Sequence, residues 1–231
     1  MARYLEVNAS SWPGELPHIG DLRHDKTLPF VRSPEEYDGS EKLKLCCTQI
    51  SGLSGYQQKK VTDYWAKYLS VETLPLKFVQ CCTSTPQQIF DALCTQDSIE
   101  VLRLKWARFA NLSAIRNLKN LRSLQIDLGS SISDLTPLGE LKNLQHLSLG
   151  DIKKTRDYSA LGNLSNLEAL HIGVGMWNWL VEMDCADFLL SLPKLNYLSM
   201  GNVRVANADA LFQLNMEQFK YLCVRLEDDK I

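Results

Sequence analysis

The stretch Ile132-Ser-Asp-Leu135-Thr-Pro-Leu138-Gly-Glu-Leu141-Lys-Asn-Leu144-Gln-His-Leu147-Ser-Leu149 decides the fold. Its apolar residues recur every third position and end in a Leu-x-Leu pair. A spacing of two places both leucines on one face of a short strand, whereas a spacing of three suits a tight 3-10 return. One such unit cannot bury its leucines alone, so the pattern predicts stacked copies that share a core.

Copies of this unit lie on both sides of it. Blocks beginning at Leu112 and Tyr158 match it at six apolar positions each, and a Leu-x-x-Leu-x-Leu strand motif continues beyond them. The middle residues of the motif fall at positions 74, 102, 124, 147, 170, 198 and 222. This spacing predicts about seven turns of a solenoid. A weaker Leu43-x-Leu45 is either an eighth strand or only the entry to the array.

These residues resemble the leucine-rich repeat family, and within it the short repeats of bacterial internalin-like proteins. The resemblance is clear over residues 111–172 and fades toward residues 71 and 226. It implies an α/β solenoid with a curved parallel sheet on the concave side and helices or 3-10 turns on the convex side. We expect true helices in the longer repeats. The family's Asn, three residues after the last strand leucine, is replaced here by Ala107, Gly129, Ile152, Gly175 and Val203, so we expect no continuous Asn ladder.

The sequence predicts that the chain has two parts. Residues 1–70 form an N-terminal cap, made of an irregular proline-containing segment and one amphipathic helix. That helix begins with a capping box at Ser54 and Gln57 and carries an apolar stripe of Val61, Tyr64, Trp65, Tyr68 and Leu69. Residues 71–231 form the solenoid. No C-terminal capping helix is evident, so either the charged tail shields the last repeat or another chain covers it, which allows self-association there.

Composition narrows the classes of partner. The 231 residues are 45% hydrophobic and 23% charged, with a net charge of −2, which disfavours nucleic acid and anionic membranes as partners. The sequence shows no secretory signal and no apolar run long enough to span a bilayer. We therefore expect a cytoplasmic location and seven reduced cysteines. Zinc-type Cys and His spacings are missing, so we expect no metal or cofactor.

Two arrangements could support an enzyme, and the sequence argues against both. Cys185-Ala-Asp187 resembles the Cys-x-Asp of bacterial ubiquitin ligases that carry leucine-rich repeats, but no residues remain for the helical catalytic domain that those enzymes need. The alternative places Cys185 in a buried outer helix. His146 and His171 are expected on adjacent strands two residues apart in register, about 8 Å apart and too far to share a metal.

Binding is the better-supported chemistry, because strand alternation sends the residues between the leucines onto the concave face. The row Gly150, Gly173 and Gly201 is explained either by turn geometry or by a bare groove that a partner approaches. The predicted partner-binding residues are the aromatic anchors Trp177, Trp179, Tyr197 and Tyr221, and the polar contacts Arg103, Lys105, Asp127, His146 and His171.

The sequence therefore predicts non-enzymatic recognition of another protein. Two biological uses stay open at this point. One is an immunity protein that neutralises a cognate bacterial toxin, and the other is an adaptor with several weaker partners. An enzyme that uses Cys185, or His146 with His171, is the remaining alternative.

Overall fold

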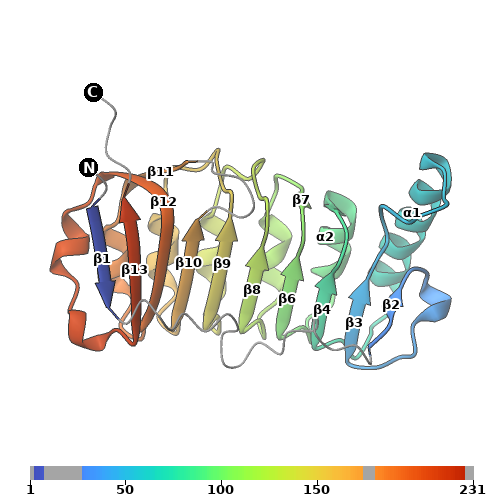
Figure 1. Cartoon of the computed structure of the whole chain (residues 1–231). Helices are drawn as coiled ribbons and strands as arrows, with labels where there is room; N and C mark the ends of the chain where they lie inside the picture. The colour runs from blue at the N-terminus through green and yellow to red at the C-terminus, as the bar shows by residue number, and fades with distance from the viewer. Residues whose placement is uncertain (1–2, 8–27, 174–179, 227–231) are drawn as a thin grey trace.

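Most of the described strands lie side by side in one long curved sheet (Figure 1). The computed structural model describes residues 3–7, 28–173 and 180–226. Neighbouring strands of the sheet are parallel, except that β1 runs antiparallel to β13. In sheet order they are β2 (Phe30–Val31), β3 (Lys42–Leu45), β4 (Phe78–Cys81), β6 (Val101–Leu104), β8 (Ser123–Ile126), β9 (His146–Gly150), β10 (Ala169–Gly173), β12 (Tyr197–Asn207), β13 (Tyr221–Leu226) and β1 (Arg3–Val7).

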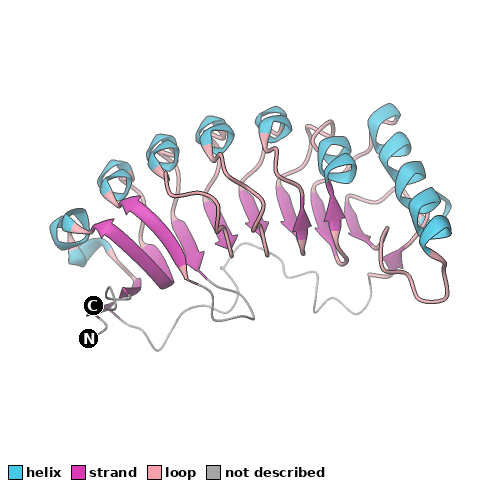
Figure 2. Ribbon diagram, turned by 90° about the horizontal axis from the view of Figure 1, so that it is seen from above, coloured by secondary structure: helices cyan, strands magenta, loops and turns pink. Residues whose placement is uncertain are grey.

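Helices occupy the outer side of this arc, and the strands line its inner side (Figure 2). The α-helices are α1 (Gly55–Val71) and α2 (Gln87–Leu93). The 3-10 helices are η2 (Pro34–Glu36), η3 (Ser113–Asn117), η4 (Thr136–Glu140), η5 (Ser159–Asn163), η6 (Asp187–Ser191), η7 (Asp209–Gln213) and η8 (Met216–Gln218). A strand followed by a tight return is what the leucine spacing predicts, and the leucine-rich-repeat solenoid is confirmed.

Between the two layers lies one continuous apolar core. Leu124, Leu147, Leu170, Leu198 and Leu222 occupy the same register position on successive strands and are buried. Burying a leucine side chain contributes about 1.5–3 kcal/mol. Because each leucine packs on those of the neighbouring turns, the turns stabilise one another.

Helix α1 begins at the predicted capping box. The amide of Gln57 donates to Ser54 Oγ at 3.3 Å, and the amide of Ser54 donates to Gln57 Oε1 at 2.9 Å. Trp65 and Leu69 are fully buried as the apolar stripe predicts, but Tyr64 is 45% exposed. The stripe is therefore narrower than its sequence pattern indicates.

One predicted strand is misplaced. The motif centred on Leu74 lies in the loop after α1, and the strand is β4, whose inward residues are Val79 and Cys81. Leu76 takes the place that Leu121 holds two turns later, since Phe78 pairs with Val101 and Val101 with Ser123. The weaker Leu43-x-Leu45 motif is a strand, β3.

Backbone hydrogen bonds between turns occupy the corner where the family carries its Asn. The amide of Ala107 donates to the Asp127 carbonyl at 2.9 Å, and the amide of Gly129 to the Gly150 carbonyl at 2.9 Å. The side chains of Ala107, Ile152 and Val203 are buried there, whereas Gly175 lies outside the described residues. An apolar stack with direct turn-to-turn bonds thus stands in place of an Asn ladder.

The first strand corrects two predictions about the ends. Residues 3–7 were expected in a cap over the first repeat, but β1 pairs with the last strand, β13, from Arg3 with Leu226 to Val7 with Leu222. The edge of the last repeat is therefore occupied by the protein's own chain. The prediction of an uncapped C-terminal repeat that is open to self-association is wrong for this edge.

The second long repeat also differs from expectation. Instead of an α-helix it holds the strand β11 (Val181–Cys185), which pairs with the extended end of β12, and the 3-10 helix η6. Val181 and Met183 are buried, and Arg156 binds the outward carboxylates of Glu182 and Asp184 at 2.8 and 2.7 Å. The first long repeat does hold a helix, α2, which follows the short strand β5 (Thr85–Pro86), paired with β7 (Ala107–Arg108).

Candidate functional site on the concave face

One row of side chains crosses the concave face at the middle of the strands. Pairing of the strands places its members next to one another, because the parallel neighbours pair in register at these positions. In sheet order the row is Phe30, Lys44, Gln80, Arg103, Gln125, Ser148, His171, Ser199 and Cys223. The half of the row from Phe30 to Gln125 carries most of its charge.

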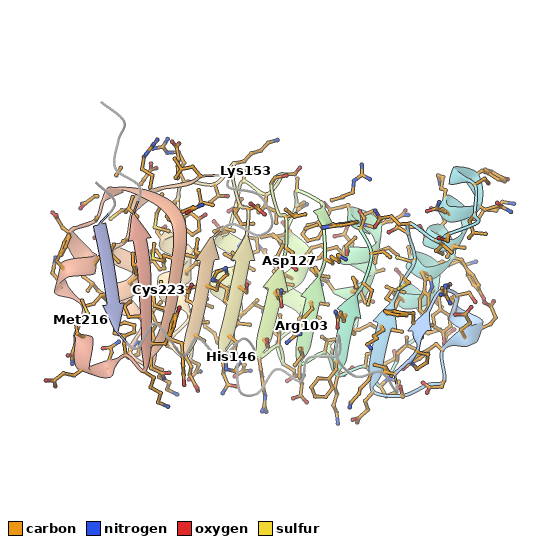
Figure 3. All side chains as sticks on the ribbon, in the orientation of Figure 1. Arg103, Asp127, His146, Lys153, Met216 and Cys223 are labelled. Atoms are coloured by element: carbon orange, nitrogen blue, oxygen red, sulfur yellow. The ribbon has the colours of Figure 1, made fainter. Side chains whose placement is uncertain are left out.

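A cavity of about 540 Å³ opens on this charged half. It holds three of the predicted partner-binding residues, Arg103, Lys105 and Asp127. Figure 3 labels Arg103 on β6 and Asp127 at the end of the neighbouring β8. The remaining lining residues are Phe30, Lys44, Gln80, Cys81, Cys82, Leu104, Trp106, Gln125, Leu128, Gly150 and Asp151.

Local contacts order the polar side chains of the cavity. Gln125 Nε2 donates to both carboxylate oxygens of Asp127, at 3.0 and 3.2 Å. The Lys105 Nζ lies 4.6 Å from the centre of the Trp106 ring, within cation–π range. Arg103 is 7% exposed, whereas Lys105 is exposed. An exposed cation on an aromatic ring, beside an oriented carboxylate, can bind both charged and apolar groups.

Trp106 and Leu128 have an unusual backbone at the rim. Their φ angles are +49° and +55°, in the left-handed region, and they are neither Gly nor Asn. Asp151 and Asn202 hold the same position in later turns. A bulky residue in this conformation costs about 1–2 kcal/mol and persists only where its surroundings hold it. The Trp106 carbonyl accepts from the Thr85 amide at 3.1 Å, which helps to hold it.

A second cavity, of about 620 Å³, shares Trp106 and Leu128 with the first. Its other lining residues include Gln49, Ser84, Gln87, Arg108, Ser130 and Ser131. Trp106 and Leu128 therefore form a ridge between two hollows. A partner that binds at this edge of the sheet would contact both residues.

The two predicted histidines lie in the centre of the sheet, outside the cavity. His146 pairs with Ser123 and Ala169, and His171 pairs with Ser148 and Ser199, so the two imidazoles are two residues out of register as expected. His146 is 5% exposed. Burial lowers the pKa of His171 below its usual value. Within the described ranges, no three His, Cys, Asp or Glu side chains gather as a metal site would require.

The predicted tyrosines lie at the far end of the face. Tyr197 on β12 pairs with Tyr221 on β13. Tyr221 is buried, and the Lys220 Nζ lies 5.9 Å from the centre of the Tyr197 ring. Trp177 and Trp179 lie outside the described residues. The predicted binding residues thus separate into a cavity group, a central histidine pair and a distal tyrosine pair.

Comparison with solved structures agrees with the fold. Internalin C2 from Listeria monocytogenes matches with a TM-score of 0.57 and 25% identity, over 76% of this chain and 67% of the internalin. The chain is a leucine-rich-repeat protein. It resembles the bacterial internalins. Internalin F of the same organism matches with a TM-score of 0.47 and 16% identity, over 78% of this chain and 58% of that one.

A leucine-rich-repeat protein of Leptospira interrogans also matches, with a TM-score of 0.42, 17% identity and coverage of 57% of this chain and 38% of that one. Protein-family models and curated protein sequences give no match to this leucine-rich-repeat protein. Folds of this kind are typically scaffolds that bind proteins, and their curvature creates an extended concave binding surface.

In this leucine-rich-repeat protein the glycine row does not reflect turn geometry. Gly150, Gly173 and Gly201 pair side by side, and none has a positive φ. A Cβ on Gly173 would lie 3.0 Å from the Gly201 carbonyl oxygen, whereas a Cβ on Gly201 would meet no atom within 4 Å. Packing therefore explains Gly173. Gly150 lines the cavity, and no positive φ requires glycine at Gly150 or Gly201.

Cys185 is not in a buried outer helix as expected. It ends strand β11, is partly exposed, and has a raised pKa because its thiol is hydrogen bonded to the Asp187 carboxylate. A raised pKa leaves little thiolate, the form that acts as nucleophile. Of the helices in the described parts of the chain, none has the length and apolar character that a bilayer crossing requires.

Lys44, Gln80 and Trp106 are among the cavity residues that the sequence analysis missed. Lys44 and Gln80 share the register of Arg103, but the misplaced motif at Leu74 hid the strand that carries Gln80. Trp106 follows the last strand residue and reaches the cavity through its left-handed backbone, which no local pattern indicates. The alternation Leu43-x-Leu45 was the available signal for Lys44.

Proposed function

We propose that this leucine-rich-repeat protein binds another protein without catalysing a reaction, and that the partner anchors in the cavity around Trp106. The observation that carries the proposal is the convergence of Arg103, Lys105, Asp127 and Trp106 on one hollow of the concave face. Trp and Arg are the residues most enriched at the energetic centres of interfaces. The parallel sheet beneath them is rigid, so little conformational entropy is lost on docking.

The chemistry of the cavity favours a partner segment with an acidic side chain beside an apolar one. Lys105 is the exposed cation of the rim and lies on the Trp106 ring. An acidic group can pair with its ammonium while an apolar neighbour packs on the indole. The bare backbone at Gly150 leaves room for the partner's main chain.

The rest of the concave face extends this contact in our proposal. Tyr197 and Tyr221, with His146 and His171, lie along the same sheet, and Trp177 and Trp179 follow its β10 strand in the sequence. Two uses fit the proposal. An immunity protein that neutralises a toxin would have one tight partner, and an adaptor would have several weaker ones.

Site-specific crosslinking tests the location of the contact. A photoreactive amino acid is placed at Lys105, and in a matched control at Asn117, which is exposed on the convex helix η3. Both full-length proteins are irradiated in an extract and purified. We expect Lys105 to capture one discrete partner that Asn117 does not. Equal capture at both positions, or capture at Asn117 alone, contradicts the proposal.

Substitution of Trp106 then measures what the ridge contributes to binding. Trp106→Gly removes the indole but keeps a residue suited to a φ of +49°. We expect affinity for the captured partner to fall at least tenfold, a change of about 1.4 kcal/mol or more. Asn117→Ala serves as the control and should bind like wild type. Unchanged affinity in the Trp106→Gly protein would place the anchor elsewhere.

A further inference from the structure

Two of the seven thiols lie next to each other across neighbouring strands. Cys46 follows β3 and Cys82 follows β4, directly after the in-register pair Leu45 and Cys81. The amide of Cys82 donates to the Leu45 carbonyl at 2.8 Å, and the amide of Cys46 donates to the Val31 carbonyl at 2.9 Å. The two backbone segments therefore remain paired in register at these cysteines.

The segments stay paired beyond this point. The amide of Thr48 donates to Thr83 Oγ1 at 3.3 Å, and Thr48 Oγ1 donates to the Ser84 carbonyl at 2.6 Å. Neighbouring strands are about 4.8 Å apart, which is within the range of about 4.4–6.8 Å that a disulfide requires between Cα atoms. The spacing expected between Cys46 and Cys82 is thus within the range for a disulfide.

Exposure separates this pair from the other cysteines of its segments. Cys46 and Cys82 are half-buried, whereas Cys47 and Cys81 are 2% and 3% exposed. Alternation puts Cys46 and Cys82 on the concave side with Lys44 and Gln80, and Cys82 lines the 540 Å³ cavity. Both thiols are therefore partly accessible, and a small reagent can reach Cys82 from the cavity.

The surroundings of the pair assign different roles to its two thiols. The interaction between the two neighbouring thiols lowers the pKa of Cys46 and raises the pKa of Cys82, whose Sγ also donates to the Gln80 carbonyl at 3.7 Å. Burial opposes the change at Cys46, and the charges of Arg32 and Lys105 add to it. By contrast, burial raises the pKa of Cys81 to about 12. Since the thiolate is the nucleophile, Cys46 is the attacking thiol and Cys82 the resolving one.

We propose that Cys46 and Cys82 form a reversible disulfide, with a low-molecular-weight disulfide such as oxidised glutathione as the oxidant. The Cys46 thiolate attacks one sulfur of oxidised glutathione, the glutathione S–S bond breaks, and one glutathione thiolate leaves with the proton that Cys46 has lost. Cys82 then loses its proton and attacks the Cys46 sulfur of the mixed disulfide. A second glutathione leaves and takes that proton. Two cysteine thiols are oxidised by two electrons, and one glutathione disulfide is reduced to two thiols.

The test is an equilibrium titration of the full-length protein with mixtures of reduced and oxidised glutathione, read by intact mass and peptide mapping. Wild type should lose two hydrogen atoms as the mixture becomes oxidising and regain them on reduction. Peptide mapping should link Cys46 to Cys82. Failure to lose the two hydrogens, or a link between other cysteines, overturns the proposal.

Three serine variants separate the roles. Cys82→Ser should stop at a mixed disulfide of Cys46 with one glutathione, because the resolving thiol is missing. Cys46→Ser should take up glutathione far more slowly than Cys82→Ser. Cys223→Ser, a half-buried thiol on the same face with Ser199 in register, should behave like wild type. A Cys82→Ser protein that still loses two hydrogens contradicts the assignment of Cys82 as the resolving thiol. The peptide mapping of the wild-type protein does not depend on whether the variants fold.

Discussion

Ile152 fills the space beside Gly129. A Cβ added at Gly129 would lie 2.4 Å from Ile152 Cδ1 and 3.0 Å from Ile132 Cδ1. This contact lies at the corner where leucine-rich repeats of the internalin type place an Asn side chain. The Ile152 side chain therefore occupies space that is available only because position 129 is a glycine.

A double-mutant cycle measures this coupling. Gly129→Ala should destabilise the protein by about 1–3 kcal/mol, because the new methyl group overlaps Ile152. Ile152→Val removes the overlapping Cδ1 and alone costs about 0.5–1.5 kcal/mol. The double variant should be more stable than the sum of the two losses by at least about 0.5 kcal/mol in urea unfolding. Additive losses would show that the two residues do not compete for space.

Gly139 and Gly162 give a matched pair at equivalent positions of successive 3-10 helices. A Cβ at Gly139 would lie 2.6 Å from the Ala160 carbonyl oxygen, whereas a Cβ at Gly162 would lie 3.4 Å from Phe188 Cβ, an ordinary contact. Gly139→Ala should therefore cost about 1–3 kcal/mol, since a backbone oxygen cannot move aside. Gly162→Ala should be neutral or stabilising by up to about 1 kcal/mol. Thermal unfolding measures the stability of both variants. Equal losses of stability in the two would contradict the packing argument.

Features that depend on one turn of the chain were predictable from the sequence. The leucine spacing from Leu112 to Ile172 fixes the strands and the 3-10 returns, and the capping box at Ser54 marks the start of α1. The alternation Val181-x-Met183 is a local signal for β11 that the expectation of a helix overlooked. The error at Leu74 arose because Cys81, rather than a leucine, fills the inward position of β4.

Features that depend on distant segments were not predictable. Pairing of β1 with β13 joins the two ends of the chain, and nothing in residues 3–7 indicates their partner. The cavity depends on the left-handed backbone at Trp106 and Leu128, which is set by bonds to neighbouring turns. The sequence therefore indicated Arg103, Lys105 and Asp127 as surface residues but not the hollow that they share.

His171 predicts a pH dependence of stability. Burial lowers its pKa in the folded protein below the ordinary value of 6.5, so the unfolded chain binds the proton more readily than the folded one. Stability from the neutral imidazole is then fully present above about pH 6.5 and is lost as the pH falls toward the lowered folded value, with a slope of at most about 1.4 kcal/mol per pH unit.

Urea unfolding between about pH 7.5 and pH 5 measures this slope, compared with His171→Gln, which cannot take up a proton. The difference in unfolding free energy between wild type and variant should shrink or reverse as the pH falls. A difference that stays constant across the range would show that His171 takes up its proton equally well in the folded and unfolded chains.

Because β1 covers the edge of β13, we expect a proline substitution in β1 to change self-association. In an antiparallel pair, alternate residues direct their amides toward the partner strand, so only one of the neighbours Tyr4 and Leu5 donates to β13. Proline is tolerated in an edge strand where the amide faces solvent and removes a bond where it faces the partner. One of the variants Tyr4→Pro and Leu5→Pro should therefore loosen β1, expose the edge of β13 and increase association between copies. The other variant should sediment like wild type over a range of protein concentrations.

If both proline variants sediment like wild type, β1 does not protect the edge of β13.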